Sequence, residues 1–198
     1  SPTGRINHRS EALAKPKSRV VWAGMLTESG GRRRYGRAMS TQHDFDFLIG
    51  AWRVDHRRMK HRLVDCRDWE AFEGFCTVAK TLGGQGNWDD NLLHLPSGSY
   101  RAKAFRAFDP LTRTWAIWWL DARNPHALDP PVIGSFADGV GTFECGDTLE
   151  GKPIRVRFQW SRTETASPRW EQAFSPDGGK SWEVNWEMDF HRLENAND

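Results

Sequence analysis

The strongest constraint on the fold is an alternation of apolar and polar side chains with a period of two residues. In the run from 182 to 191, the apolar positions are Trp182, Val184, Trp186, Met188 and Phe190, and the positions between them are polar. Residues 154–160 (IRVRFQW) repeat the pattern. Successive side chains of a β-strand point to opposite faces, so each run predicts a strand with one apolar and one polar face. No segment has apolar residues at helical spacing over three turns, which argues against long helices.

Sequences rich in Gly, Pro, Asn and Asp separate these runs and predict turns, among them GGQGN, LPSGS, NPHALDPP and SPDGGKS. We predict about ten strands, at roughly 46–60, 68–82, 87–95, 99–108, 113–121, 131–136, 140–146, 153–162, 168–175 and 181–192. Consecutive hairpins with one apolar face avoid exposed edges by closing on themselves. The predicted fold is therefore all-β, an up-and-down antiparallel β-barrel. The eleven tryptophans are enough to line a cavity in such a barrel.

Charge is distributed unevenly along the 198 residues. Residues 1–38 contain nine Lys/Arg and two Glu, a net charge of +7, whereas the remaining 160 residues carry a net charge of −5. We predict that 1–38 is a basic, disordered extension and that 39–198 is a single barrel domain. Because the basic residues concentrate in the extension, the overall charge gives no reason to expect that the barrel binds nucleic acid.

Other features bear on compartment and cofactors. No secretory signal or membrane-length apolar run is present in the sequence. Three cysteines without a C-x-x-C pair indicate a reducing, cytoplasmic environment. The histidines lack the paired spacing of zinc or iron sites, and His191 falls on a polar strand face, which disfavours haem. No phosphate-binding glycine loop precedes a helix. We expect no metal and no cofactor.

Residues 50–52 (GAW) resemble the G-x-W motif of lipocalin and calycin barrels. In those folds the tryptophan closes the barrel floor and an arginine of the last strand packs across it. Here Trp52 opens the first long strand, and Arg192 ends the last one. The resemblance implies a lipocalin-like barrel in which Arg192 contacts Trp52.

Most of the domain, residues 44–192, is also similar to a family of lipocalin-like bacterial proteins of unknown function. The similarity runs through DFDFLIGAWRVDHRR, LGGQGNWDDN, FDPLTRTWAIWW, DPPVIGSF and RWEQAFSPDGGKSWEVNWEMDF. This resemblance implies a fold and no mechanism. SPDGGKSW also resembles the Asp-box of sialidases, in which Asp and Gly residues tighten a hairpin.

Several polar residues share a strand face with apolar ones. If Trp52 points inward, so do His56 and Arg58, and the same alternation places further polar side chains inside. Burying an unpaired charge costs several kcal/mol, so these groups require an internal partner, water or a ligand. An internal partner would be a pair such as Glu73 with Arg58 or Arg106. The predicted ligand-binding residues are His56, Arg58, Glu73, Asn91, Arg106, Trp119, Trp170, Gln172 and Trp186.

The leading hypothesis is a barrel that binds one small, largely apolar or amphipathic molecule with a polar or acidic end. One alternative is an enzyme of isomerase or cyclase type, with His56 or Glu73 as general acid or base; no Ser-His-Asp motif supports a hydrolase. Another is a structural barrel with a filled interior. We expect no membrane partner, and the sequence is compatible with either a monomer or a homodimer.

Overall fold

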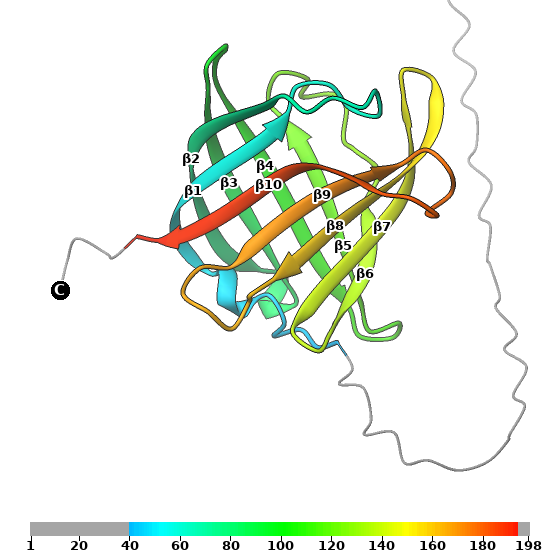
Figure 1. The fold of residues 1–198 in the computed structure, drawn as a ribbon. Coiled ribbons are helices and arrows are strands. Elements are labelled where there is room, and N and C mark those ends of the chain that lie inside the picture. Colours follow the sequence, from blue (N-terminus) through cyan, green and yellow to red (C-terminus); the bar gives the residue numbers. More distant parts are fainter. Residues whose placement is uncertain (1–39, 194–198) are drawn as a thin grey trace, which may run out of the picture. The chain divides into compact units, whose positions relative to one another are not determined.

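The computed structural model describes residues 40–193. They form a closed barrel of ten strands, each antiparallel to its neighbours, in which β10 returns to pair with β1 (Figure 1). The strands are β1 (Gly50–Met59), β2 (Trp69–Thr81), β3 (Gly86–Leu95), β4 (Gly98–Asp109), β5 (Thr114–Asp121), β6 (Val132–Ala137), β7 (Val140–Leu149), β8 (Lys152–Ser161), β9 (Arg169–Ser175) and β10 (Glu183–Arg192). The predicted all-β, up-and-down barrel is confirmed. The predicted extension at 1–38 lies outside the described residues.

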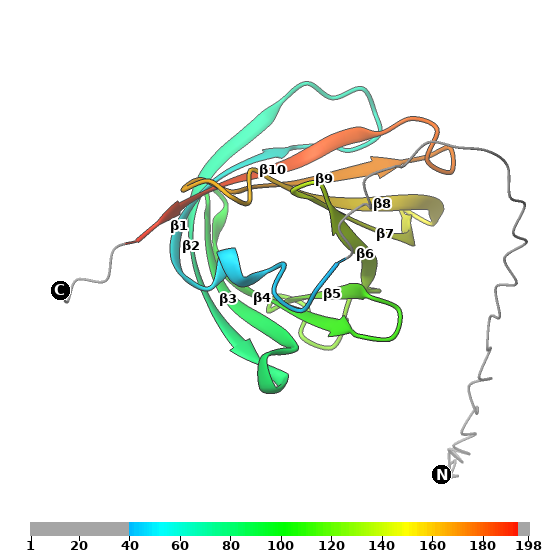
Figure 2. The same ribbon diagram turned by 90° about the horizontal axis from the view of Figure 1, so that it is seen from below.

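The first strand begins later than predicted, at Gly50 instead of residue 46. Residues Asp46–Leu48 form a 3-10 turn, η1, and the segment that contains it runs across one end of the barrel (Figure 2). Phe45 is 1% exposed and packs edge-on against Trp115 and Phe136, with ring centroids 4.9 Å away in both cases. The alternation of Phe45 with Phe47 therefore belongs to a plug at the barrel end, and not to a strand.

Strand pairing fixes which side chains fill the barrel. Trp52 is paired directly with Cys76, and His56 with Phe72. Directly opposed residues of an antiparallel pair point to the same face, so the even-numbered residues of both strands point inward. Gly74 belongs to this inner set, and a Cβ there would lie 2.7 Å from Nε2 of His56. The glycine therefore makes room for the imidazole.

The predicted contact between Trp52 and Arg192 is present. The two residues are paired across β1 and β10, and the guanidinium carbon of Arg192 lies 4.1 Å from the centroid of the Trp52 ring. Arg192 also donates to the backbone oxygens of Ile49 and Phe47, at 2.9 and 2.8 Å. At Gly50, where φ is +126°, a Cβ would lie 2.7 Å from Nη1 of Arg192. The glycine thus provides both the backbone conformation and the space for the arginine.

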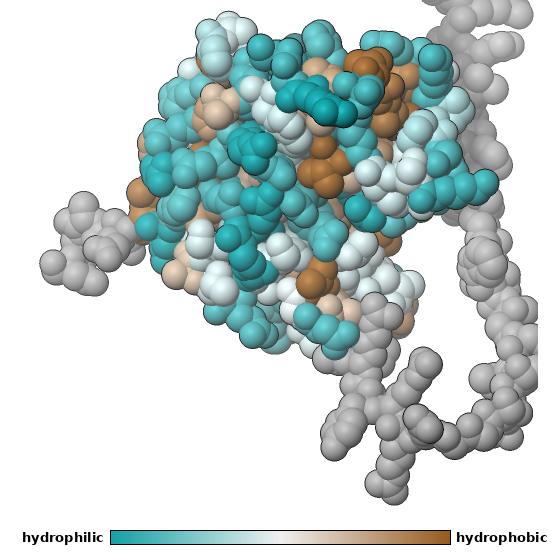
Figure 3. All heavy atoms as spheres, viewed as in Figure 1, coloured by the Kyte–Doolittle hydropathy of each residue, from teal (hydrophilic) through white to brown (hydrophobic). Residues whose placement is uncertain are grey.

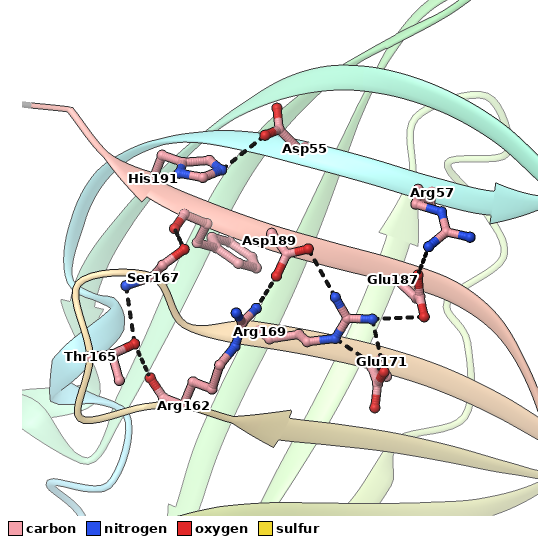
Figure 4. A network of polar contacts seen from close by, with 11 residues as sticks. Asp55, Arg57, Arg162, Thr165, Ser167, Arg169, Glu171, Glu187, Asp189 and His191 are labelled. Carbon is pink, nitrogen blue, oxygen red and sulfur yellow. Dashed lines mark hydrogen bonds and ion pairs between the residues drawn. The ribbon is translucent and has the colours of Figure 1, made fainter.

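The charged residues that alternate with the inward-facing ones after Trp52, namely Arg53, Asp55 and Arg57, lie on the outer face of the barrel. The side seen in Figure 3 is mostly hydrophilic, with isolated hydrophobic residues. Arg169 of β9 lies between two carboxylates of β10, 2.7 Å from Glu187 and 2.9 Å from Asp189 (Figure 4). His191 of β10 contacts Asp55 of β1 at 2.9 Å. Charged residues between the apolar ones thus link neighbouring strands on the solvent side.

The hairpin between β9 and β10 has the local geometry that the Asp-box resemblance implies. Asp177 Oδ1 accepts from the backbone N–H groups of Lys180 and Ser181, at 3.0 and 2.9 Å. These bonds, with that from the Ser181 hydroxyl, hold the pKa of Asp177 well below its usual range. Gly179 has a φ of +99° and accepts through its carbonyl from Trp182 Nε1 at 3.1 Å. The motif tightens a turn, and its residues lie outside the cavity described next.

Candidate functional site

A cavity of about 150 Å³ lies among the inward-facing side chains of β3, β4, β5, β8, β9 and β10. Its apolar lining consists of Ala104, Ile117, Trp119, Phe158, Trp160, Trp170, Trp186, Met188 and Phe190. Its polar lining consists of Asp89, Asn91, Arg106, Asp129 and Gln172. Trp186 meets Trp119 and Trp170 edge to face, with centroid distances of 6.2 and 5.7 Å. Such contacts hold aromatic rings in fixed orientations, so this wall has a defined shape.

A hydrogen-bonded ion pair occupies one part of the lining. Arg106 Nη2 lies 2.6 Å from Asp89 Oδ2, and the two side chains are 6% and 3% exposed. Arg106 Nη1 also donates to Asn87 Oδ1 at 2.9 Å. The other carboxylate oxygen, Asp89 Oδ1, accepts from the backbone N–H of Ala104 at 2.7 Å and from the Asn91 amide. Both charges are therefore matched inside the protein, as buried charges require.

A β-bulge in β10 adds a second polar pair beside the cavity. The register with β9 shifts between Val184 and Trp186, so that Asn185 is the extra residue. Asn185 is fully buried, and its Oδ1 accepts from Gln172 Nε2 at 2.8 Å. A bulge changes the direction in which neighbouring side chains point. Here it allows both Asn185 and Trp186 to be buried although they are adjacent in sequence.

His56 supports the aromatic wall from behind. It is 5% exposed, its ring stacks on Phe72 at 4.6 Å, and its Nδ1 accepts from Trp186 Nε1 at 3.2 Å. Burial, with a smaller contribution from the charge of Arg58, lowers the pKa of His56 to about 3. The imidazole is therefore neutral at pH 7. It does not line the cavity, and its role in the structure is to fix the orientation of Trp186.

The burial of His56 makes the free energy of unfolding depend on pH. The unfolded histidine has a pKa near 6.5, so between about pH 6.5 and 3 the unfolded chain binds one proton more than the folded protein. Acidification through this window therefore lowers the free energy of unfolding, and the contribution of His56 between pH 7 and 5 is about 2 kcal/mol. Urea denaturation at both pH values measures it.

The control for this prediction is His56→Gln, whose amide oxygen can still accept from Trp186 and which has no proton to gain. It should lose most of the pH-dependent step, while His191→Gln on the exposed outer face should keep it. An unchanged step in His56→Gln would show that His56 is not its source.

Two predicted site residues have other partners. Arg58 lies 3.2 Å from Glu70, its neighbour on β2, and does not line the cavity. The predicted inward orientation of Glu73 is wrong: its side chain is exposed and lies 3.2 Å from Arg53 on the outer face. The internal pairs suggested from sequence, Glu73 with Arg58 or Arg106, are therefore replaced by pairs with other acids. A role for Arg58 in ligand binding stays a prediction.

A second hollow of about 100 Å³ adjoins the cavity and shares part of its lining, including Trp119, Asp129 and Gln172. Although Asp129 is largely exposed, partial burial of its carboxyl group, with the negative charge of Asp147 nearby, raises its pKa. Cys145 also lines this hollow, and burial raises the pKa of its thiol to about 11. A thiol that stays protonated at pH 7 is a poor nucleophile. The hollow therefore offers no activated cysteine.

Six of the nine predicted ligand-binding residues line the cavity: Asn91, Arg106, Trp119, Trp170, Gln172 and Trp186. His56, Arg58 and Glu73 do not. Asp89 and Trp160 are among the lining residues that the prediction missed. Both carried a usable signal, because Asp89 shares the strand face of Asn91, and Trp160 ends the alternating run IRVRFQW.

No family model matches the chain, and no curated protein is significantly similar to it. The closed barrel is compatible with the lipocalin-like fold that the G-x-W motif implies, and membership of that family stays a prediction. Within residues 40–193, no three His, Cys, Asp or Glu side chains come close enough together to hold a metal ion. Over the same residues, none of the helices has the length and apolar character needed to span a membrane.

Proposed function

We propose that the protein binds one small, largely apolar molecule inside the barrel, with the polar end of the molecule toward Arg106 and Asp89. The observation that carries this proposal is a cavity with aromatic walls and a hydrogen-bonded polar pair at one place in its lining. Ligand sites typically combine an apolar lining with a few placed polar groups. A cavity of about 150 Å³ is the size that accommodates a single aromatic ring.

Binding is favoured over acid-base catalysis by the positions of the candidate catalytic groups. A general acid or base must reach the substrate within hydrogen-bond distance or through one water. His56 lies behind the aromatic wall, and Glu73 is on the outside of the barrel. Two carboxylates line the cavity: Asp89 is engaged by Arg106, and Asp129 lies in the loop between β5 and β6 and is largely exposed to solvent. A filled structural barrel is disfavoured by the cavity itself.

Filling the cavity tests this proposal. Ala104 lines the cavity and is 3% exposed. Ala104→Leu adds three carbon atoms to the lining, so it should weaken binding of ethylbenzene, an apolar probe of one ring, by more than tenfold. Isothermal titration calorimetry of the wild type and the variant measures the change. Native mass spectrometry of the purified protein would identify a molecule that is retained from the cell.

The matched control is Ala116→Leu, on the outward-facing side of β5, which should bind ethylbenzene as the wild type does. Thermal melting checks that both variants are folded. If Ala104→Leu binds ethylbenzene as tightly as the wild type does, the barrel interior is not the binding site and the proposal fails.

A further inference from the structure

Two residues that line the cavity carry a buried N–H group with no hydrogen-bond partner among the described residues: Arg106 at Nε and Trp160 at Nε1. The residues are 5% and 2% exposed. Buried donors are nearly always paired, because leaving one unpaired loses its hydrogen bond to water without replacement. Two unpaired donors on residues that line one cavity therefore point to an acceptor that binds there.

The side chains that carry the two donors lie close together. The guanidinium carbon of Arg106 is 5.9 Å from the centroid of the Trp160 ring. Each of the other two nitrogens of Arg106 donates one hydrogen bond, Nη1 to Asn87 and Nη2 to Asp89. Nε is the guanidinium nitrogen that makes no hydrogen bond within the described residues, and it belongs to the side chain that is paired with Asp89 in the lining. A carbonyl oxygen has two lone pairs and can accept from two donors.

The charges in the lining select against an acid. The positive charge of Arg106 is already matched by Asp89 at 2.6 Å. The third ionisable residue that lines the cavity, Asp129, is an acid like Asp89 and adds no positive charge. A ligand carboxylate would therefore enter a site with no uncompensated cation and would lose its hydration there. This argues against the acidic end that the sequence left open.

We propose that the polar end of the ligand is a neutral carbonyl group, as in an aryl ketone or amide, that accepts hydrogen bonds from Arg106 Nε and Trp160 Nε1. The apolar part then contacts Trp119, Trp170 and Trp186. This inference rests on the proposed function, since it describes the ligand of the same cavity. It goes further by naming the chemical class of the polar group and the two atoms that recognise it.

Three probes of nearly equal size separate the possibilities: acetophenone, which has a neutral carbonyl; ethylbenzene, which has no acceptor; and benzoate, which is an anion. Calorimetric titration of the wild type should give a dissociation constant about tenfold lower for acetophenone than for ethylbenzene, the effect of a hydrogen bond to a buried donor. Benzoate should bind at least tenfold more weakly than acetophenone.

Trp160→Phe removes one donor and keeps an aromatic ring in the wall. It should reduce the preference for acetophenone over ethylbenzene by about fivefold, because only Arg106 Nε still donates. Trp118→Phe is the matched control: Trp118 points outward from β5 and does not line the cavity, so its loss should leave the preference unchanged. A second readout needs no variant. The indole N–H resonance of Trp160 in ¹⁵N-labelled wild type should shift more with acetophenone than with ethylbenzene.

Each outcome decides between the two proposals. Equal affinity for acetophenone and ethylbenzene, or equal shifts of the Trp160 resonance, would mean that water satisfies the donors; the carbonyl inference would then fail while the proposed function stands. Tighter binding of benzoate than of acetophenone would overturn the inference in favour of an acid. Failure of all three probes to bind the wild type would remove the proposed function and this inference together.

Discussion

Asp89→Asn is expected to lower the free energy of unfolding by about 3–5 kcal/mol, the usual loss when one member of a buried ion pair is removed. The substitution keeps Oδ1, which can still accept from the backbone N–H of Ala104. It places an amide N–H₂ or an uncharged oxygen where the carboxylate meets Arg106, at 2.6 Å in the wild type. The free energy of unfolding therefore falls because the guanidinium of Arg106 stays buried without its counter-charge. Urea denaturation at pH 7 measures it.

The double variant Asp89→Asn with Arg106→Met distinguishes this cause from a packing defect. It removes both charges, so it should be more stable than either single variant. The matched surface pair is Arg155 with Glu144, at 2.7 Å, whose side chains are 44% and 34% exposed. Glu144→Gln should change the stability by less than about 1 kcal/mol. A similarly small effect for Asp89→Asn, or a double variant as unstable as the sum of the singles, would contradict the buried-pair assignment.

The barrel could be predicted because its main determinant is local. A strand with one dry face must alternate along its own sequence, and turn residues mark where it ends, so each run can be recognised without knowledge of its neighbours. The plug at residues 45–48 could not be recognised this way. Phe45 and Phe47 continue the alternation, and only their packing across the barrel end, against Trp115 and Phe136, separates them from β1.

The orientation of β2 required information from another strand. Both of its faces carry apolar groups, with Trp69 and Phe75 on one side and Phe72 and Cys76 on the other, so alternation does not select the inner face. The pairing of Trp52 with Cys76 makes that choice. A shift of one residue would have moved Glu73 inside, as the sequence analysis assumed.

Alternation within single strands predicts some of the residues that line the cavity, but not how they pair with one another. The inward positions of Asn91, Arg106 and Gln172 follow from alternation within their own strands. The partner of Arg106 does not, because the pair with Asp89 depends on the register between β3 and β4. The volume of the cavity depends on how the tryptophan rings pack against one another, which no single strand determines. The unpaired donors of Arg106 and Trp160 likewise emerge only once all neighbours are placed.

Trp52→Ala is expected to lower the free energy of unfolding by about 3–5 kcal/mol, the range for loss of a large buried aromatic side chain. Trp52 is 1% exposed, packs edge to face with Phe190 at 5.9 Å, and donates through Nε1 to the backbone oxygen of Leu48 at 2.7 Å. Its removal leaves a cavity where β1, β10 and the plug meet. Arg192→Ala should cost less, about 1–2 kcal/mol, because it removes an exposed cation over the ring and two hydrogen bonds to the plug.

A double-mutant cycle tests whether the two residues act together. Arg192 stacks on a surface that Trp52 provides, so the loss in the double variant should fall short of the sum of the single losses by about 0.5–2 kcal/mol. The control cycle pairs Trp52→Ala with Arg155→Ala on the outer face of β8, where the losses should simply add. Additivity at Arg192 as well would show that the arginine holds the plug only through the carbonyls of Phe47 and Ile49. The G-x-W and arginine arrangement would then be a coincidence of position, and it would no longer support the resemblance to lipocalin barrels.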